Sequence, residues 1–151
     1  MQMSDLSDIE LRAWQALLHA HHDITRKLDG ELRREHGLSF DSYDVLLRLA
    51  RAPGGALRMT DLAERVMVPQ STLTRRVDRL VEQGLVERER PTADARAMLA
   101  RLTRQGRRVL ARAARTHLDG IRRHYTGRLS SAQLAAVAEA LEVIAGAHHE
   151  H

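Results

Sequence analysis

Apolar residues recur at helical spacing between residues 69 and 83. The apolar positions that make this stripe are Leu73, Val77 and Leu80. Their separations of four and three residues predict a helix with one buried face. Pro69 suits the first turn of such a helix, and Gly84 supplies a residue that can turn left-handed after its end. A shorter apolar segment that begins at a Thr60 cap precedes it, so we expect two helices joined by a sharp turn.

The other face of the longer helix is polar and cationic. It carries Thr72, Arg75, Arg76 and Arg79. Hydroxyl and guanidinium groups on such a helix can reach base edges or phosphates in a DNA major groove, and a shorter helix packed at an angle completes a helix-turn-helix. A solvated face on an ordinary bundle helix is the alternative, and helical spacing alone does not distinguish the two.

Two segments of strand character follow, joined by a turn. GLVERER and ARAMLARLT flank PTAD, and the Pro, Thr and Asp of that segment favour a turn. A basic hairpin directly after a basic helix is explained by a winged helix-turn-helix, in which the hairpin is the wing. Residues 57–59 are too short to classify alone and are a candidate third strand of the wing.

Long helices are predicted at both ends of the chain. Ser7 with Glu10, and Ser130 with Gln133, have the spacing of capping boxes, in which side chains and backbone amides at a helix start satisfy each other. The first helix extends to Gly37, a second one is capped by Ser39 or Asp41, and a later one extends from Thr103 to about Gly127. We expect residues 1–38 and 104–151 to form a helical dimerisation region and residues 39–103 to form a winged helix-turn-helix within one protomer. The predicted fold class is therefore mainly α.

The charge distribution and composition of the chain limit the classes of function that it can have. Residues 58–128 hold 17 arginines against 8 acidic residues, whereas the whole chain of 151 residues has a net charge of only +4. A polyanionic partner such as double-stranded DNA explains this concentration of charge. Cysteine is absent, so thiol chemistry is excluded, and no motif of an enzyme or cofactor site occurs. The polar, acidic start and the absence of an 18-residue apolar run predict a cytoplasmic protein without a membrane partner.

Several short motifs together resemble the MarR family of transcriptional regulators. They are Leu62-Ala63, Gln70 to Arg75, Asp78-Arg79-Leu80, Gly84-Leu85-Val86, and Asp94-x-Arg96 leading to Leu102-Thr103 and Gly106. The resemblance implies a homodimer on a pseudo-palindromic operator, a wing arginine at Arg96 that enters the minor groove, and Asp94 as the residue that holds the wing. The expected DNA-contacting residues are Gln70, Ser71, Thr72, Thr74, Arg75, Arg76, Arg79, Arg90, Asp94 and Arg96.

The resemblance also implies a ligand-responsive repressor whose effector is a small aromatic or phenolic acid. The candidate effector residues are Arg12, Trp14, His19 and Tyr43, which offer a cation, an aromatic wall and a polar partner. Each of them can equally be a core, dimer or solvated residue. Nine histidines raise a metal-sensing alternative, but zinc needs three or four ligands in firm geometry and the histidines are scattered, so we assign no metal residue. A non-specific architectural DNA-binding protein is the other alternative.

Overall fold

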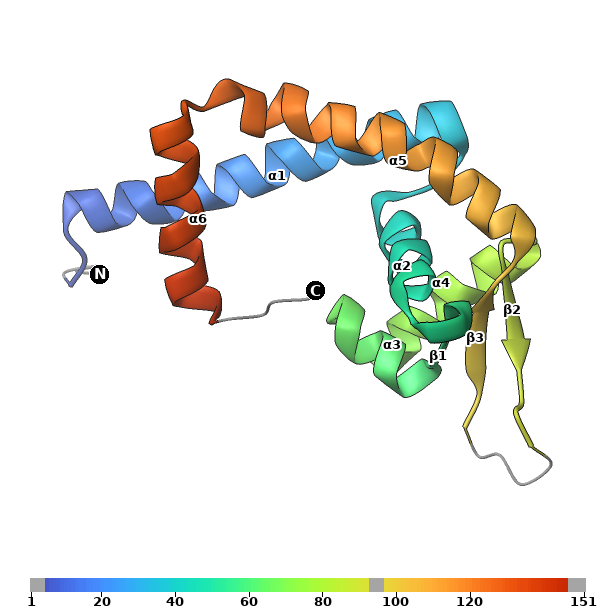
Figure 1. The fold of residues 1–151 in the computed structure, drawn as a ribbon. Coiled ribbons are helices and arrows are strands. Elements are labelled where there is room, and N and C mark those ends of the chain that lie inside the picture. Colours follow the sequence, from blue (N-terminus) through green and yellow to red (C-terminus); the bar gives the residue numbers. More distant parts are fainter. Residues whose placement is uncertain (1–4, 93–96, 147–151) are drawn as a thin grey trace. The chain divides into compact units, whose positions relative to one another are not determined.

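The computed structural model describes residues 5–92 and 97–146. The chain consists of two compact units, Met1–Lys27 with Leu118–His151 and Leu28–His117. The second unit contains helix α2 (Phe40–Arg51), helix α3 (Met59–Val66) and helix α4 (Gln70–Glu82), with the short helical turn η1 (Pro53–Gly55) and three strands (Figure 1). Two long helices, α1 (Asp8–His36) and α5 (Arg104–His124), contribute residues to both units.

The strands form one antiparallel sheet in the order β1-β3-β2. Strand β1 is Ala56–Arg58, β2 is Val86–Glu89 and β3 is Leu99–Leu102. Leu57 pairs with Ala100, and Val86 pairs with Leu102. The hairpin β2–β3 projects from the helices of this unit (Figure 1). The winged helix-turn-helix is confirmed, and residues 57–58 do belong to a third strand.

The core of the second unit explains why its boundaries fall inside the long helices. Leu32 and Leu38 from the end of α1, and Leu110 and Ala113 from α5, are buried in the same cluster as the apolar faces of α2, α3 and α4. The C-terminal end of α1 and the first half of α5 therefore pack on the winged helix-turn-helix. A dimerisation role for the terminal helices stays a prediction.

The predicted helix caps are present. Ser7 and Glu10 hydrogen-bond reciprocally at the start of α1, with the Ser7 amide 2.6 Å from a Glu10 carboxylate oxygen. Helix α6 (Ser131–Ala145) begins with the capping box of Ser130 and Gln133. Ser39, rather than Asp41, caps α2 by accepting a hydrogen bond from the Ser42 amide. These side chains satisfy amides that a helix start leaves without partners.

Three helix boundaries differ from the prediction, and the smallest difference is that Pro69 takes the N-cap position of α4 rather than a place in its first turn. Helix α3 begins at Met59 and its cap position is Arg58, so Thr60 lies inside the helix. The reason is that the Met59 amide donates to the Met98 carbonyl at 2.9 Å, so β1 continues directly into the helix without a separate cap. Helix α5 ends at His124, before Gly127, and a short helical turn η2 (Thr126–Arg128) follows it.

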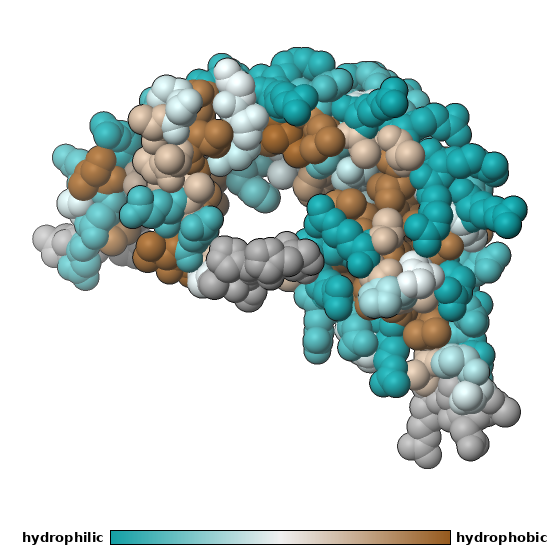
Figure 2. Space-filling model, viewed as in Figure 1, coloured by the Kyte–Doolittle hydropathy of each residue, from teal (hydrophilic) through white to brown (hydrophobic). Residues whose placement is uncertain are grey.

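The first unit exposes many apolar side chains. Nine of the large hydrophobic residues described as exposed belong to it, and they are Leu6, Ile9, Trp14, Leu17, Leu18, Leu118, Leu141, Val143 and Ile144. Hydrophobic residues are visible at the surface of α6 in Figure 2. None of the described residues of α6 is buried, although its sequence has an apolar stripe. This unit therefore leaves apolar surface uncovered in the single chain.

Candidate nucleic-acid interface

Helix α4 presents a polar face to solvent because its apolar stripe is fully buried. Leu73, Val77 and Leu80 are each 0% exposed. Ser71, Thr74, Arg75 and Arg79 are exposed. Gly84, with a φ of 75°, adopts the left-handed conformation that ends the helix segment. The helix is thus held by one side, and the opposite side is free to contact a partner.

Thr72 and Arg76 do not lie fully on this exposed face, contrary to the sequence interpretation. Both are half-buried, and the Arg76 guanidinium lies 3.3 Å from the Asp41 carboxylate near the start of α2. With 3.6 residues per turn, position 76 comes next to Leu73 and Leu80, and position 72 lies at the side of the stripe, about a quarter turn from both. A DNA contact by either residue stays a prediction, and for Arg76 it requires exchange of the ion pair with Asp41.

Helix α3 and the turn after it hold α4 at its N-terminal end. Leu62, Ala63 and Val66 of α3 are buried in the common core. The turn passes through Met67, whose backbone is left-handed at a φ of 58° and whose side chain is 83% exposed. This short helix and the tight turn produce the sharp helix–helix connection that a helix-turn-helix needs.

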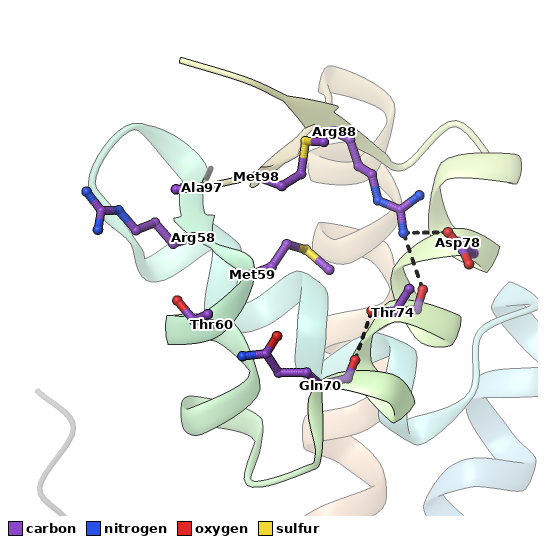
Figure 3. A pocket seen from close by; sticks show the side chains of 9 residues that line it. All are labelled: Arg58, Met59, Thr60, Gln70, Thr74, Asp78, Arg88, Ala97 and Met98. Atoms are coloured by element: carbon purple, nitrogen blue, oxygen red, sulfur yellow. Dashed lines mark hydrogen bonds and ion pairs between the residues drawn. The ribbon is translucent and has the colours of Figure 1, made fainter. Parts of the chain in front are cut away.

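Arg88 connects the wing to α4. Its guanidinium forms an ion pair with the Asp78 carboxylate and also donates to the Thr74 carbonyl oxygen at 3.4 Å (Figure 3). Asp78 and Thr74 lie one turn apart on α4, so one side chain of β2 contacts two successive turns of the helix. Sequence reasoning missed Arg88, because the alternation in GLVERER places it on a strand without showing which side chain turns towards the helix. The contact ties the orientation of α4 to that of β2.

A groove of about 680 Å³ lies between the wing and the two helices. Its lining residues are Arg58, Met59, Thr60, Gln70, Thr74, Asp78, Arg88, Ala97 and Met98. Figure 3 shows the side chains of Met59 and Gln70 extending towards this groove from α3 and α4. The Arg58 guanidinium with the hydroxyl and amide groups suits the oxygen atoms of a phosphate backbone, whereas the Arg88 guanidinium is paired with Asp78; the thioethers suit apolar parts of sugars and bases. The groove brings Gln70 and Thr74, two of the predicted contacts, beside the base of the wing.

A second arginine braces the sheet. Arg101 of β3 lies 2.6 Å from the Glu89 carboxylate on β2 and donates to the Gly54 carbonyl at 2.9 Å. It therefore links both outer strands or their flanking turns to the central strand. Of the predicted wing contacts, Arg90 is exposed at the end of β2, whereas Asp94 and Arg96 lie outside the described residues.

The predicted effector residues lie on two sides of α1 and in the core of the second unit, and their common site stays a prediction. Arg12 and His19 lie seven residues apart on one side of α1, and Trp14 is on roughly the opposite side of the same helix. All three are exposed, and Trp14 is 55% exposed. Tyr43 is only 4% exposed, so its ring is core rather than an accessible wall of a site. The amphipathic pattern of α2 did not reveal this, because Tyr is found both in cores and at ligand sites.

Tyr43 packs against His117 of α5. The two rings have centroids 4.5 Å apart, and Phe40 lies on the same histidine with a centroid distance of 5.8 Å. Burial lowers the pKa of His117, although the carboxylates of Asp44 and Glu31 oppose the shift, and burial also raises the pKa of Tyr43. The Nδ1 atom of His117 is buried without a hydrogen-bond partner among the described residues. The neutral form of His117 is therefore the one that suits this core.

Other kinds of site find no support among residues 5–92 and 97–146. No three histidine or acidic side chains in these ranges are grouped so that they could hold a metal ion. No helix that the structure describes has the length and apolar character needed to cross a membrane.

Comparison with known proteins agrees with this geometry. A family model described as the MarR family matches residues 36–97. Sco3205 from Streptomyces coelicolor, a MarR family regulator solved in complex with DNA, is 34% identical and superposes with a TM-score of 0.88, covering 93% of this chain and 88% of that one. AbsC from the same organism, also a MarR family regulator, is 32% identical with a TM-score of 0.86, covering 93% and 94%.

A relative with an assigned function is also a transcriptional regulator. The HTH-type transcriptional repressor YetL of Bacillus subtilis (strain 168) is 32% identical over 104 residues, which are 66% of this chain and 61% of that protein. These relatives are transcriptional regulators and not enzymes. With the helix-turn-helix, the wing and the matching sequence all present, the chain belongs to the MarR family of transcriptional regulators.

Proposed function

We propose that this regulator is a homodimeric repressor that recognises a pseudo-palindromic operator and is released from it by a small aromatic or phenolic acid. The observation that carries the proposal is the exposed face of α4, where Ser71, Thr74, Arg75 and Arg79 lie opposite a fully buried stripe and beside the wing. Hydroxyl groups and arginines on a helix that fits the major groove can read base edges. The structurally similar Sco3205 was solved in complex with DNA, which supports the same partner here.

The exposed apolar surface of the first unit supports the homodimer. Trp14, Val143 and Ile144 are 55%, 80% and 77% exposed in the single chain. Large apolar side chains exposed in this number indicate an interaction site, and a second copy is the partner that a two-fold operator requires. Repression is supported by the likeness to YetL, which is described as a repressor.

The effector is the part of the proposal that rests on the family resemblance. Arg12 is exposed and is the cation that we assign to a ligand carboxylate. Tyr43 is left out, because its ring is buried in the described chain. A ligand that releases DNA must prefer the DNA-free conformation, and the operator must then weaken ligand binding by the same factor.

A footprint on an operator selected from random duplexes tests the repressor proposal. We expect two protected half-sites whose centres are about 10 bp apart, or a multiple of that distance, as a two-fold dimer demands. Sedimentation should give a dimer at the same concentration. A monomer in solution together with one protected half-site would contradict the proposal.

Calorimetric titration of salicylate-like acids, with and without operator, tests the effector. We expect weaker ligand binding in the presence of operator, and loss of the ligand response in Arg12→Ala with operator affinity retained. Arg26→Ala, another exposed arginine of α1, is the matched control. Equal ligand affinity in both titrations would remove the acid from the proposal.

A further inference from the structure

Helix α5 carries an arginine stripe outside the groove and the exposed face of α4. The stripe consists of Arg104, Arg107, Arg108, Arg112 and Arg115. All five are exposed, and Arg104, Arg108, Arg112 and Arg115 lie on the side opposite to the buried Leu110 and Ala113, whereas Arg107 lies at the edge of the stripe with its guanidinium beside Gly55. The surface over the first half of α5 is strongly polar in Figure 2.

The stripe is not neutralised by the protein. No Asp or Glu occurs in the segment from Arg104 to Leu118, and none of the five arginines forms an ion pair with any residue that the structure describes. The only hydrogen bond from their side chains to another described side chain joins Arg108 to Gln105 at 3.0 Å. By contrast, Arg33, Arg76, Arg88 and Arg101 are all paired with carboxylates.

This arrangement is unfavourable for a helix in isolation. Arg104, Arg108 and Arg112 follow each other at four residues, and like charges at that spacing repel. Helix α4, in comparison, carries three arginines and two acidic residues. Of these two helices, α5 therefore carries the larger uncompensated positive charge, and α4, which faces the groove, the smaller. A polyanion would offset the repulsion.

The stripe is attached rigidly to the DNA-binding elements. Thr103 donates to the Gly84 carbonyl at 2.7 Å and accepts from the Gly106 amide at 2.9 Å, so the start of α5 is bonded to the residue that follows the C-cap of α4. Gly106 lies so close to the Leu85 carbonyl oxygen that a Cβ atom would stand 2.2 Å from it. DNA that is bound by α4 and the wing therefore meets the stripe in a fixed orientation.

We propose that the arginine stripe binds the phosphate backbone of the duplex that flanks the operator. The proposal rests on the operator binding proposed above and adds a second surface to it. The segment from Arg104 to Arg115 is about 16 Å long at 1.5 Å per residue, which corresponds to about five phosphates along one strand at 3.4 Å each. The stripe faces away from the core of its unit, so the flanking duplex must curve to reach it, as DNA does around other regulators.

The test compares two duplexes and two variants. One duplex is the shortest operator that keeps full preference, and the other extends it by about 15 bp on each side, or roughly one and a half helical turns. The stripe variant is Arg108→Gln with Arg112→Gln and Arg115→Gln. The control variant replaces three exposed arginines elsewhere, Arg26→Gln, Arg34→Gln and Arg51→Gln.

We expect wild-type protein to bind the long duplex more tightly than the short one. The stripe variant should bind the long duplex about tenfold or more weakly than wild type does, with its affinity for the short duplex unchanged. On the long duplex, the slope of log affinity against log salt concentration should become shallower by about 0.9 for each phosphate that the variant no longer neutralises. The control variant should match the wild type on both. DNA curvature, measured by gel mobility of permuted fragments, should decrease in the stripe variant alone.

Two results would overturn the inference. An equal loss of affinity for both duplexes would mean that the stripe contacts the operator itself. No loss of affinity for either duplex would mean that the stripe is solvated or binds an acidic protein. Both differ from a failure of the proposed function, in which wild-type protein would show no preference for the operator in the short duplex.

Discussion

The contact of Arg88 with α4 predicts a measurable coupling between the wing and the recognition helix. In a double-mutant cycle with Arg88→Ala and Asp78→Ala, each single change should lower the free energy of unfolding by about 1 kcal/mol, and the double change should cost less than their sum. The side chains of the pair are 31% and 48% exposed, so solvent screens much of their attraction. An effective dielectric between that of a protein surface and water gives about 1–4 kcal/mol at 4 Å before desolvation and side-chain entropy, which leaves about 0.5–1 kcal/mol of coupling.

Urea unfolding followed by circular dichroism, at low and at high salt, measures this coupling. The coupling should decrease at about 1 M salt, where charges are screened within about 3 Å. Glu82→Ala is the matched control, since Glu82 lies one turn beyond Asp78 on the same helix and forms no ion pair with Arg88. A coupling that is zero at low salt, or as large for Glu82 as for Asp78, would refute the contact in solution.

Packing, exposure and burial at three other positions each predict a measurable effect. Gly106→Ala should cost about 1–3 kcal/mol of stability in thermal unfolding, because its Cβ would clash with the Leu85 carbonyl. Gly30→Ala is the control and should stabilise α1 by about 0.5–1 kcal/mol, since its Cβ would meet only the flexible Arg34 side chain, at 3.4 Å. Equal effects of the two changes would contradict the close packing of α5. Arg75→Ala should weaken operator binding by about 1–3 kcal/mol without changing stability, since its side chain is exposed, and an unchanged affinity in a gel-shift titration would show that this arginine reads no base. Burial lowers the pKa of His117 below its value in the unfolded chain, so its contribution to stability should be full above the unfolded pKa and be lost as the pH falls through about 6.5 towards the folded pKa. In urea unfolding, His117→Phe should therefore lose less stability than wild type between about pH 7.5 and 5.5. An identical loss in both proteins would refute the neutral buried histidine.

Much of the fold could be predicted from local signals. The capping boxes at Ser7 and Ser130, the stripe of α4 and the turn at Gly84 are all confirmed, because each depends on residues close together in the sequence. The start of α3 at Met59 was predicted wrongly, since it is set by a hydrogen bond to Met98, which lies far along the chain.

The candidate site was less predictable, because side-chain orientation depends on what each helix packs against. Arg76 turns towards Asp41 of α2, and Arg88 turns towards Asp78, although neither pairing leaves a periodic signal in the sequence. Tyr43 is buried against His117, 74 positions along the chain. The concentration of positive charge, in contrast, could be predicted from the sequence. The excess of arginine over residues 58–128 includes both the exposed face of α4 and the arginine stripe of α5.

Sequence-specific DNA recognition by α4 and the wing is the central claim, and the ratio of affinities for operator and scrambled duplex tests it most directly. Both duplexes should have the same length and be titrated at the same salt concentration, since non-specific binding depends steeply on salt. We predict that the wild-type dimer prefers the operator by about 10³-fold or more, and that Arg75→Ala loses most of that preference while its binding to scrambled duplex changes little. Equal affinity of the wild-type protein for the two duplexes would contradict the claim and identify a non-specific DNA-binding protein instead.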